Sequence, residues 1–153
     1  MTRYTSLKGI QDILPPAISQ WQKVEQTAKD VFSVYGFQEL RAPIIESTDI
    51  FIRSIGETTD IVEKEMYTFP DRDGTSLTLR PEGTAGTVRA FIEHGAYVEG
   101  PQKWFYLGPM FRHERPQKGR YRQFHQIDAE ALGFAGPDVE AEQIAMLARL
   151  WKE

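Results

Sequence analysis

The stretch that most constrains the fold of this chain runs from Lys103 to Gly133. It contains two runs rich in aromatic and β-branched residues, and Pro116 and Gly119 mark a loop between them. Such a pattern is typical of a β-hairpin. A cationic hairpin on an acidic chain (net charge -4) predicts a local anionic partner rather than a generally adhesive surface. Its basic residues, six of the 18 in the chain, are Lys103, Arg112, Arg115, Lys118, Arg120 and Arg122.

The segments around this hairpin predict helices and a second hairpin. Apolar residues recur at spacings of three and four over about residues 17–35, which predicts an amphipathic helix that Gly36 ends. We also expect a short strand over 37–43, a short helix from 47–49 to Gly56, a loop over 57–65, a hairpin around 71–74, a helix from Thr84 to Gly95, and a helix that opens at 136–138.

This order of elements favours an α+β domain with a mainly antiparallel sheet, because hairpins take the place of βαβ units. The length of 153 residues suits one domain. The last helix is still strongly periodic at Glu153, so we expect the chain to be part of something longer. A natural carboxy-terminal helix that frays is the alternative.

Composition excludes several classes of site. The chain has no cysteine, which excludes disulfides and thiolate metal sites, and its three histidines show no ligand spacing. The sequence has neither the Gly-x-x-x-x-Gly-Lys-Ser/Thr motif nor the Gly-x-Gly-x-x-Gly motif of phosphate-binding loops. We expect no metal site and no permanently bound cofactor. No apolar run approaches the roughly 18 residues of a membrane span, and there is no signal peptide. We therefore expect a cytoplasmic protein that has no membrane partner.

Alternation along the second strand of the basic hairpin predicts a polar face. One face would carry Gln123, His125, Ile127, Ala129 and Ala131, and it is the better candidate for the core. The opposite face carries polar groups that are costly to bury unpaired, so it is predicted to be the floor of a site, with Arg112 nearby as an anion ligand. A cross-strand ion pair is the alternative for any single residue. The polar face consists of Phe124, Gln126, Asp128, Glu130 and Leu132.

Four stretches resemble the histidyl-tRNA synthetase branch of the class II aminoacyl-tRNA synthetases. Residues 111–126, Phe-Arg-His-Glu-Arg-Pro-Gln-Lys-Gly-Arg-Tyr-Arg-Gln-Phe-His-Gln, resemble motif 2 of that class, and residues 35–43 and onward resemble motif 1. Residues 8–12, Lys-Gly-Ile-Gln-Asp, resemble the family's amino-terminal signature. Residues 79–84, Leu-Arg-Pro-Glu-Gly-Thr, resemble the loop that grips the substrate amino group.

The resemblance implies an antiparallel sheet flanked by helices and a homodimer formed through motif 1. It implies ATP-dependent activation of L-histidine to histidyl-adenylate, with Mg²⁺ accompanying ATP, and transfer to tRNA(His). Arg112 would bind the α-phosphate and the histidine carboxylate as the catalytic residue. The other residues that the resemblance assigns to histidine are Glu82, Gly83, Thr84, Gln126 and Glu130, and those it assigns to ATP are Glu114, Arg120, Tyr121 and Phe124.

The same resemblance implies parts that these 153 residues lack: a histidine-specific segment, motif 3 and an anticodon-binding domain. We therefore expect residues 1–153 to be an amino-terminal part of a catalytic domain, truncated before motif 3 and weakly active or inactive alone. A synthetase-like regulatory subunit of ATP phosphoribosyltransferase is one alternative, and a free-standing histidine- or nucleotide-binding module is another. The joint presence of Arg112, Glu114, Arg120 and Phe124 favours the synthetase.

Overall fold

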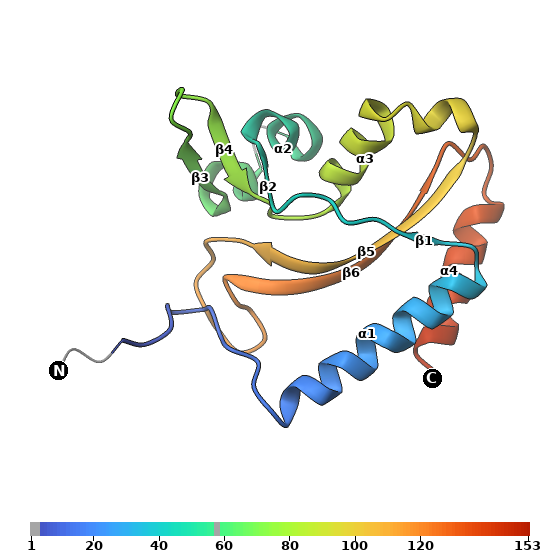
Figure 1. The fold of residues 1–153 in the computed structure, drawn as a ribbon, viewed down its shortest axis with the longest axis horizontal. Coiled ribbons are helices and arrows are strands. Elements are labelled where there is room, and N and C mark those ends of the chain that lie inside the picture. The colour runs from blue at the N-terminus through green and yellow to red at the C-terminus, as the bar shows by residue number, and fades with distance from the viewer. Residues whose placement is uncertain (1–3, 57–58) are drawn as a thin grey trace. The chain divides into compact units, whose positions relative to one another are not determined.

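A computed structural model describes residues 4–56 and 59–153 of the chain. The chain divides into two units, each described here by itself. Unit 1 comprises the described residues of Met1–Ile13, Ala42–Gly86 and Gly108–Gln126, and unit 2 comprises Leu14–Arg41, Thr87–Leu107 and Ile127–Glu153. Figure 1 shows the elements, which are α1 (Ala17–Val34), β1 (Gln38–Glu39), β2 (Ile45–Ser47), α2 (Thr48–Ile55), η1 (Ile61–Glu65), β3 (Tyr67–Pro70), β4 (Ser76–Leu79), α3 (Thr84–Glu93), η2 (Ala96–Glu99), β5 (Gln102–Phe111), β6 (Gln123–Leu132) and α4 (Asp138–Leu150).

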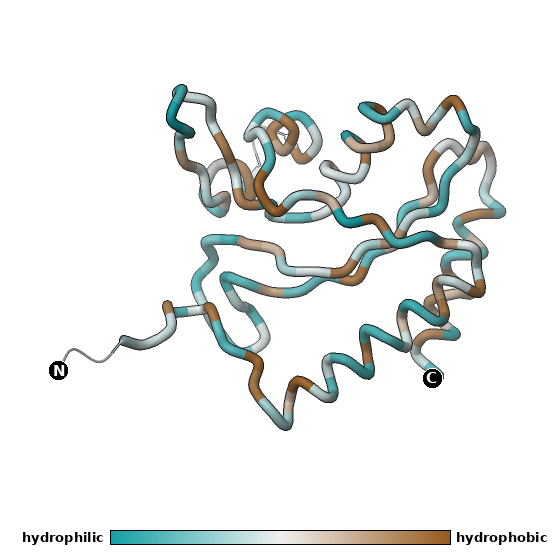
Figure 2. The backbone as a smooth tube through the Cα atoms, in the orientation of Figure 1, coloured by the Kyte–Doolittle hydropathy of each residue, from teal (hydrophilic) through white to brown (hydrophobic). Residues whose placement is uncertain are grey.

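Unit 2 is organised around a cluster of aromatic side chains. The Phe32 ring of α1 lies 5.2 Å from the Phe105 ring of β5 and 6.2 Å from the Phe37 ring, measured between centroids. Met146 of α4 completes the buried cluster, and Ile127 of β6 packs against it. Figure 2 shows apolar and polar residues alternating along α1, as an amphipathic helix requires. The predicted core face of the second strand is thus confirmed at Ile127 and also at Ala129.

Unit 1 contains a three-stranded antiparallel sheet in the order β2-β4-β3. Its interior includes polar groups that are paired with one another. The buried hydroxyl of Thr78 lies 2.9 Å from that of Thr48 and 3.2 Å from that of Thr68. Thr48 also lies 2.8 Å from the hydroxyl of Ser76. Pairing these hydroxyls between α2 and the strands offsets the cost of removing them from water.

Strands β5 and β6 form the predicted basic hairpin, and Figure 1 shows them running in opposite directions. They belong to a sheet of order β1-β5-β6 in which β1 pairs with β5 in parallel. The mixed α+β class is therefore confirmed, while the expectation of a mainly antiparallel sheet holds fully only for the sheet of unit 1. The helices that cover residues 17–34, 48–55 and 84–93 agree with the predictions.

Three local predictions were wrong. The expected strand over 37–43 is only the two residues of β1, because only Gln38 and Glu39 find pairing partners on β5. Part of the expected loop over 57–65 is the helical turn η1, and residues 57 and 58 lie outside the described part. The last helix ends at Leu150, short of Glu153, and Trp151, the residue that follows it, is 84% exposed.

Candidate active site

Arg112, which follows β5, contacts the other parts of the predicted site in unit 1. Its Nε donates a hydrogen bond of 2.9 Å to the carbonyl oxygen of Pro81. Its guanidinium carbon lies 5.1 Å from the centre of the Phe124 ring on β6, a cation–π contact. Within the described residues its terminal amino groups form no hydrogen bond, so they remain available to an anion. The expected proximity of Arg112 to the floor of the site is confirmed at Phe124.

Arg80, which is only 7% exposed, holds the start of the loop that follows β4. Its Nε donates to the carbonyl oxygen of Pro109 at 2.9 Å, and its Nη1 donates to that of Ala42 at 3.1 Å. Hydrogen bonds to carbonyl oxygens satisfy a guanidinium that could not otherwise be buried. Arg80 therefore ties the start of the loop to two other segments of unit 1.

Glu82 lies just before α3, where its carboxylate caps the helix. It accepts hydrogen bonds from the backbone N–H of Thr84 and from that of Ala85, the latter at 3.1 Å. The amino terminus of a helix favours a negative charge, so the helix and the carboxylate stabilise each other. A carboxylate offers about four acceptor sites, so Glu82 retains capacity for a further donor such as an ammonium.

The floor of the site on β6 contains a buried amide oxygen without a partner. Among the described residues, Gln126 Oε1 is buried and accepts no hydrogen bond. Buried polar atoms are nearly always paired, so this orphaned acceptor marks a place where a ligand or a water could supply a donor. Gln126 is the last residue of unit 1.

Farther along β6, in unit 2, lies Asp128, whose Oδ2 is likewise buried without a partner in the described residues. Burial raises the pKa of Asp128 above its ordinary value of 3.8, and a hydrogen bond with Tyr106 offsets part of that rise. Glu130, the predicted contact of the histidine side chain, also lies on this half of β6 and is half-buried.

The loop between β5 and β6 carries the residues expected to contact ATP. The side chain of Glu114 is only 9% exposed and forms an ion pair with Arg120, although its Oε2 accepts no well-directed hydrogen bond. The Nε of Arg122 donates to the backbone oxygen of Glu114 at 3.2 Å. Tyr121 is 38% exposed and lies beside these residues in the chain. Basic groups in this loop are therefore partly engaged by the protein itself.

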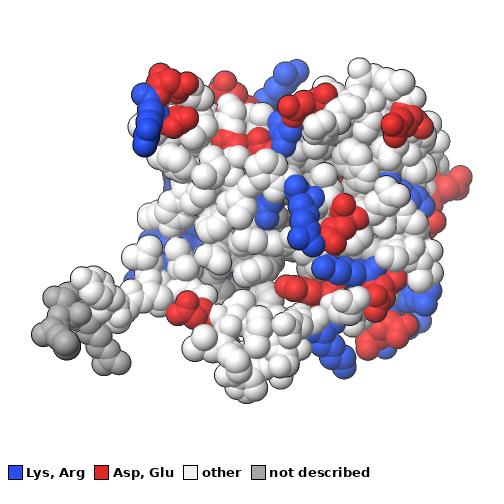
Figure 3. Space-filling view, in the orientation of Figure 1, with Lys and Arg blue, Asp and Glu red and all other residues white. Residues whose placement is uncertain are grey.

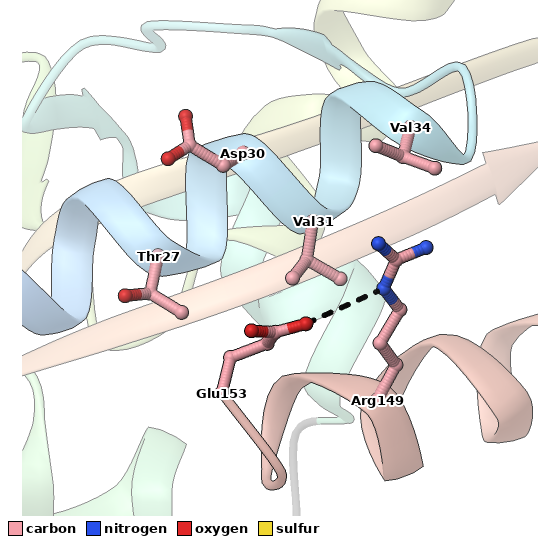
Figure 4. A pocket seen from close by; sticks show the side chains of 6 residues that line it. All are labelled: Thr27, Asp30, Val31, Val34, Arg149 and Glu153. Atoms are coloured by element: carbon pink, nitrogen blue, oxygen red, sulfur yellow. Dashed lines mark ion pairs between the residues drawn. The ribbon is translucent and has the colours of Figure 1, made fainter.

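The charged surface is mixed, and Figure 3 shows basic and acidic side chains near one another on the face drawn. Unit 2 has a hollow of about 270 Å³ along α1 and α4. Figure 4 shows Arg149 and Glu153 across this hollow, with an ion-pair distance of 3.8 Å. A more apolar groove of about 500 Å³ lies beside Val24, Leu147 and Trp151. None of the predicted site residues lines either hollow.

Unit 1 thus contains most of the predicted site residues, and contacts join Arg112 to Phe124 and to the loop before α3. Glu130 alone belongs to unit 2. Sequence reasoning missed Arg80, although an arginine that ends an apolar strand was a usable signal. It also gave no role to Gly9, because nothing local reveals that residue's distant contacts. The predicted site residues of unit 1 are Glu82, Gly83, Thr84, Arg112, Glu114, Arg120, Tyr121, Phe124 and Gln126.

The fold has close counterparts among solved structures. A crystal structure of apo S. aureus histidyl-tRNA synthetase matches 98% of this chain and 34% of its own, with a TM-score of 0.83 and 39% identity. A Bacillus halodurans structure described as an ATP phosphoribosyltransferase regulatory subunit/histidyl-tRNA synthetase matches 99% of this chain and 39% of its own, with a TM-score of 0.82 and 19% identity. The fold is therefore that of a histidyl-tRNA synthetase-like protein.

The sequence narrows this class to one family. Residues 9–153 match the family model for histidyl-tRNA synthetase. A histidine–tRNA ligase of Anaeromyxobacter sp. (strain K) is 61% identical over 146 residues, which cover 95% of this chain and 35% of that protein. The chain belongs to the histidyl-tRNA synthetase family, and it spans about a third of the length of the curated relatives it matches. Among the described residues, no helix has the length and apolar character to cross a membrane.

Proposed function

We propose that residues 1–153 form the amino-terminal part of the catalytic domain of a histidine–tRNA ligase, cytoplasmic in location. In the whole protein, this domain activates L-histidine with ATP and transfers the histidyl group to tRNA(His). The observation that carries the proposal is the combination, among the described residues of unit 1, of terminal amino groups on Arg112 that form no hydrogen bond and a buried amide oxygen on Gln126 that accepts none. Such a pair suits a ligand that carries both an anion and an N–H donor.

Histidine would be held through its α-ammonium and its carboxylate. Glu82, whose carboxylate has spare acceptor capacity, and Thr84 would bind the ammonium beside Gly83, with Gln126 as a further acceptor. Glu130 would lie in the pocket for the imidazole. Because Glu82 is fixed by two backbone donors at the start of α3, its position is set before substrate binds.

The nucleotide would be held by the β5–β6 hairpin. Phe124 would stack on the adenine ring, and the loop residues Glu114, Arg120 and Tyr121 would contact ATP. Arg112 lies over one face of the Phe124 ring, so a base stacked on the opposite face would bring its phosphates near the guanidinium.

Catalysis would rest on positioning and electrostatic stabilisation. The histidine carboxylate attacks the α-phosphorus, the bond to pyrophosphate breaks, and pyrophosphate leaves with its electron pair. Arg112 lowers the repulsion between the two anions and stabilises charge on the α-phosphate. Mg²⁺ would enter with ATP as part of that substrate. Among the described residues, no group of three acidic or histidine side chains is placed to hold a metal ion.

A regulatory subunit of ATP phosphoribosyltransferase is the second candidate, because the fold alone is shared with the Bacillus halodurans protein. Two observations favour the ligase: the 61% identity to a histidine–tRNA ligase, and the presence of Arg112, Glu114, Arg120 and Phe124 together. We also propose that the whole protein forms a homodimer through residues 35–43 and onward.

Calorimetry of the 153-residue chain tests this function. We expect binding of a non-hydrolysable sulfamoyl analogue of histidyl-adenylate, loss of that binding in Arg112→Ala and Glu82→Ala, and adenylate formation that is weak or absent. Binding of histidine without any affinity for ATP or the analogue would favour the regulatory candidate. An analogue affinity that neither substitution changes would contradict the site, and full-length-like aminoacylation by these residues alone would contradict the expected weakness.

A further inference from the structure

The amino-terminal segment of unit 1 forms a turn that contacts the start of β6. The N–H of Ile10 donates to the carbonyl oxygen of Leu7 at 3.0 Å, which closes the turn. The carbonyl oxygen of Gly9 then accepts two hydrogen bonds, from the N–H of Arg122 at 2.7 Å and from that of Gln123 at 3.2 Å. Figure 1 shows this segment, in blue, running beside the orange loop. The turn therefore holds the carboxy-terminal end of the loop.

The same contact extends to Arg112 through one peptide group. The peptide between Arg122 and Gln123 donates its N–H to Gly9, while its carbonyl oxygen accepts the backbone N–H of Arg112 at 2.9 Å. Hydrogen bonds linked through one peptide group polarise and strengthen one another. Gly9 is thus the far end of a short chain of bonds that fixes the backbone of Arg112.

Two features require glycine at this position. Its φ is +83°, a conformation that residues with a side chain rarely adopt. A Cβ added there would lie 2.9 Å from Cγ of Arg122 and 3.0 Å from Cγ of Pro116, both in the β5–β6 loop. Alanine at position 9 would therefore push this loop away, in addition to straining its own backbone.

We propose that Gly9 is a positioning residue for the ATP half of the site. Its turn sets the loop that carries Glu114, Arg120 and Tyr121, and it sets the backbone of Arg112. This role rests on the proposed function, because it presumes that the loop and Arg112 bind ATP. It predicts that disturbing Gly9 weakens ATP binding more than histidine binding, because Arg112 is the one histidine ligand that Gly9 positions, whereas Glu82 is fixed separately at the start of α3.

The test compares Gly9→Ala with Gly74→Ala, a matched control in the same unit. Gly74 has a φ of +89°, but a Cβ there would meet nothing within 4 Å, so this variant shares the backbone strain without the collision. Each variant is titrated by calorimetry with ATP alone and with histidine alone. We expect ATP affinity to fall at least about tenfold in Gly9→Ala, histidine affinity to change by at most about threefold, and both affinities to hold in Gly74→Ala.

The exchange rates of backbone amides provide a second test, which needs no ligand. In Gly9→Ala the amides of Arg112 and Gln123 should exchange faster, while the amide of Leu40, bonded to Phe105 in unit 2, should not change. A general loss of protection in every amide would mean a folding defect and would contradict a local positioning role.

A double-mutant cycle tests the collision itself. Arg122→Ala removes the nearest clashing atom, so Gly9→Ala should cost less ATP affinity in that background than in the wild type. An ATP affinity that Gly9→Ala leaves unchanged, or equal losses for ATP and histidine, would overturn the inference while leaving the proposed function standing. A wild-type chain that binds neither histidine nor ATP would overturn the proposed function, and the inference with it.

Discussion

The two units of this chain differ in the balance of apolar and polar side chains that they bury. In unit 2, the Phe32, Phe37 and Phe105 rings pack with Met146 into an apolar cluster. In unit 1, polar groups are buried and satisfied: Arg80 donates to backbone oxygens, and Thr48 and Thr78 pair their hydroxyls. Apolar packing tolerates small shifts at modest cost, whereas hydrogen bonds fix direction. The predicted site lies mainly in unit 1, which contains these buried hydrogen bonds.

This difference predicts that mutations can change the stability of the chain and its ligand affinity separately. Changes to the aromatic cluster should lower the free energy of unfolding, while changes to the polar framework of unit 1 should also alter ligand affinity. The β6 strand passes through both units, with Phe124 and Gln126 in unit 1 and Ile127 and Ala129 in unit 2. It therefore offers neighbouring positions at which the distinction can be examined.

Phe32→Ala should have the largest effect on stability. Phe32 is 1% exposed and contacts two other rings, so its loss removes buried area and leaves a cavity. We expect the free energy of unfolding to fall by about 3–5 kcal/mol in a urea titration. Val24→Ala on the same helix, 57% exposed, is the control and should change it little. Equal losses in the two variants would contradict the account of the core.

Arg80→Met should come next, and it should also reduce histidine affinity. Removing the guanidinium leaves the carbonyl oxygens of Ala42 and Pro109 without their donors, at about 1–3 kcal/mol in unfolding free energy. The loop bearing Glu82 would lose its anchor. Arg41→Met is the control, because the Arg41 side chain is 80% exposed and pairs only with Glu39 in the described part. Unchanged histidine affinity in Arg80→Met would show that the loop is held by other contacts.

Arg80 and Gly9 also show where prediction from sequence stopped. Periodicity and glycine placed α1, α2 and α3 well, because those signals are local to each segment. The pairing of β1 with β5 depends on residues that are distant in the chain, as does the contact of Gly9 with Arg122. Motifs predicted the residues of the candidate site. They did not predict Arg80 and Gly9, because these residues support the site through hydrogen bonds to segments that are distant in the sequence.

Thr78→Val should have a moderate effect that depends on its partner. The substitution removes one hydrogen-bond partner of the buried Thr48 hydroxyl. We therefore expect the unfolding free energy to fall by about 1–2 kcal/mol. In a double-mutant cycle with Thr48→Val, the second substitution should cost less than it does alone, because the paired hydroxyls are removed together. Strict additivity in the urea titrations would show that the two hydroxyls do not interact.

Asp128→Asn should have the smallest effect, and its sign depends on pH. Burial raises the pKa of Asp128 in the folded state above its ordinary 3.8, so the folded state binds that proton more tightly than the unfolded state does. The contribution of Asp128 to stability is therefore greatest below pH 3.8, and it falls as pH rises from there through the raised pKa. Asparagine cannot ionise, so the variant should gain stability relative to wild type across that window. Thermal melts from acid to neutral pH should show this divergence, and a difference that does not vary with pH would contradict it.

The most direct test of the central claim is hydrogen exchange of the chain with and without the sulfamoyl analogue of histidyl-adenylate. We expect the analogue to protect amides in unit 1, at Thr84, Arg112 and Gln126, and to leave those of α1 and α4 unchanged. Protection confined to α1 and α4, beside the apolar groove of unit 2, would contradict the placement of the site. An exchange pattern that saturating analogue does not alter anywhere would contradict the proposed function itself.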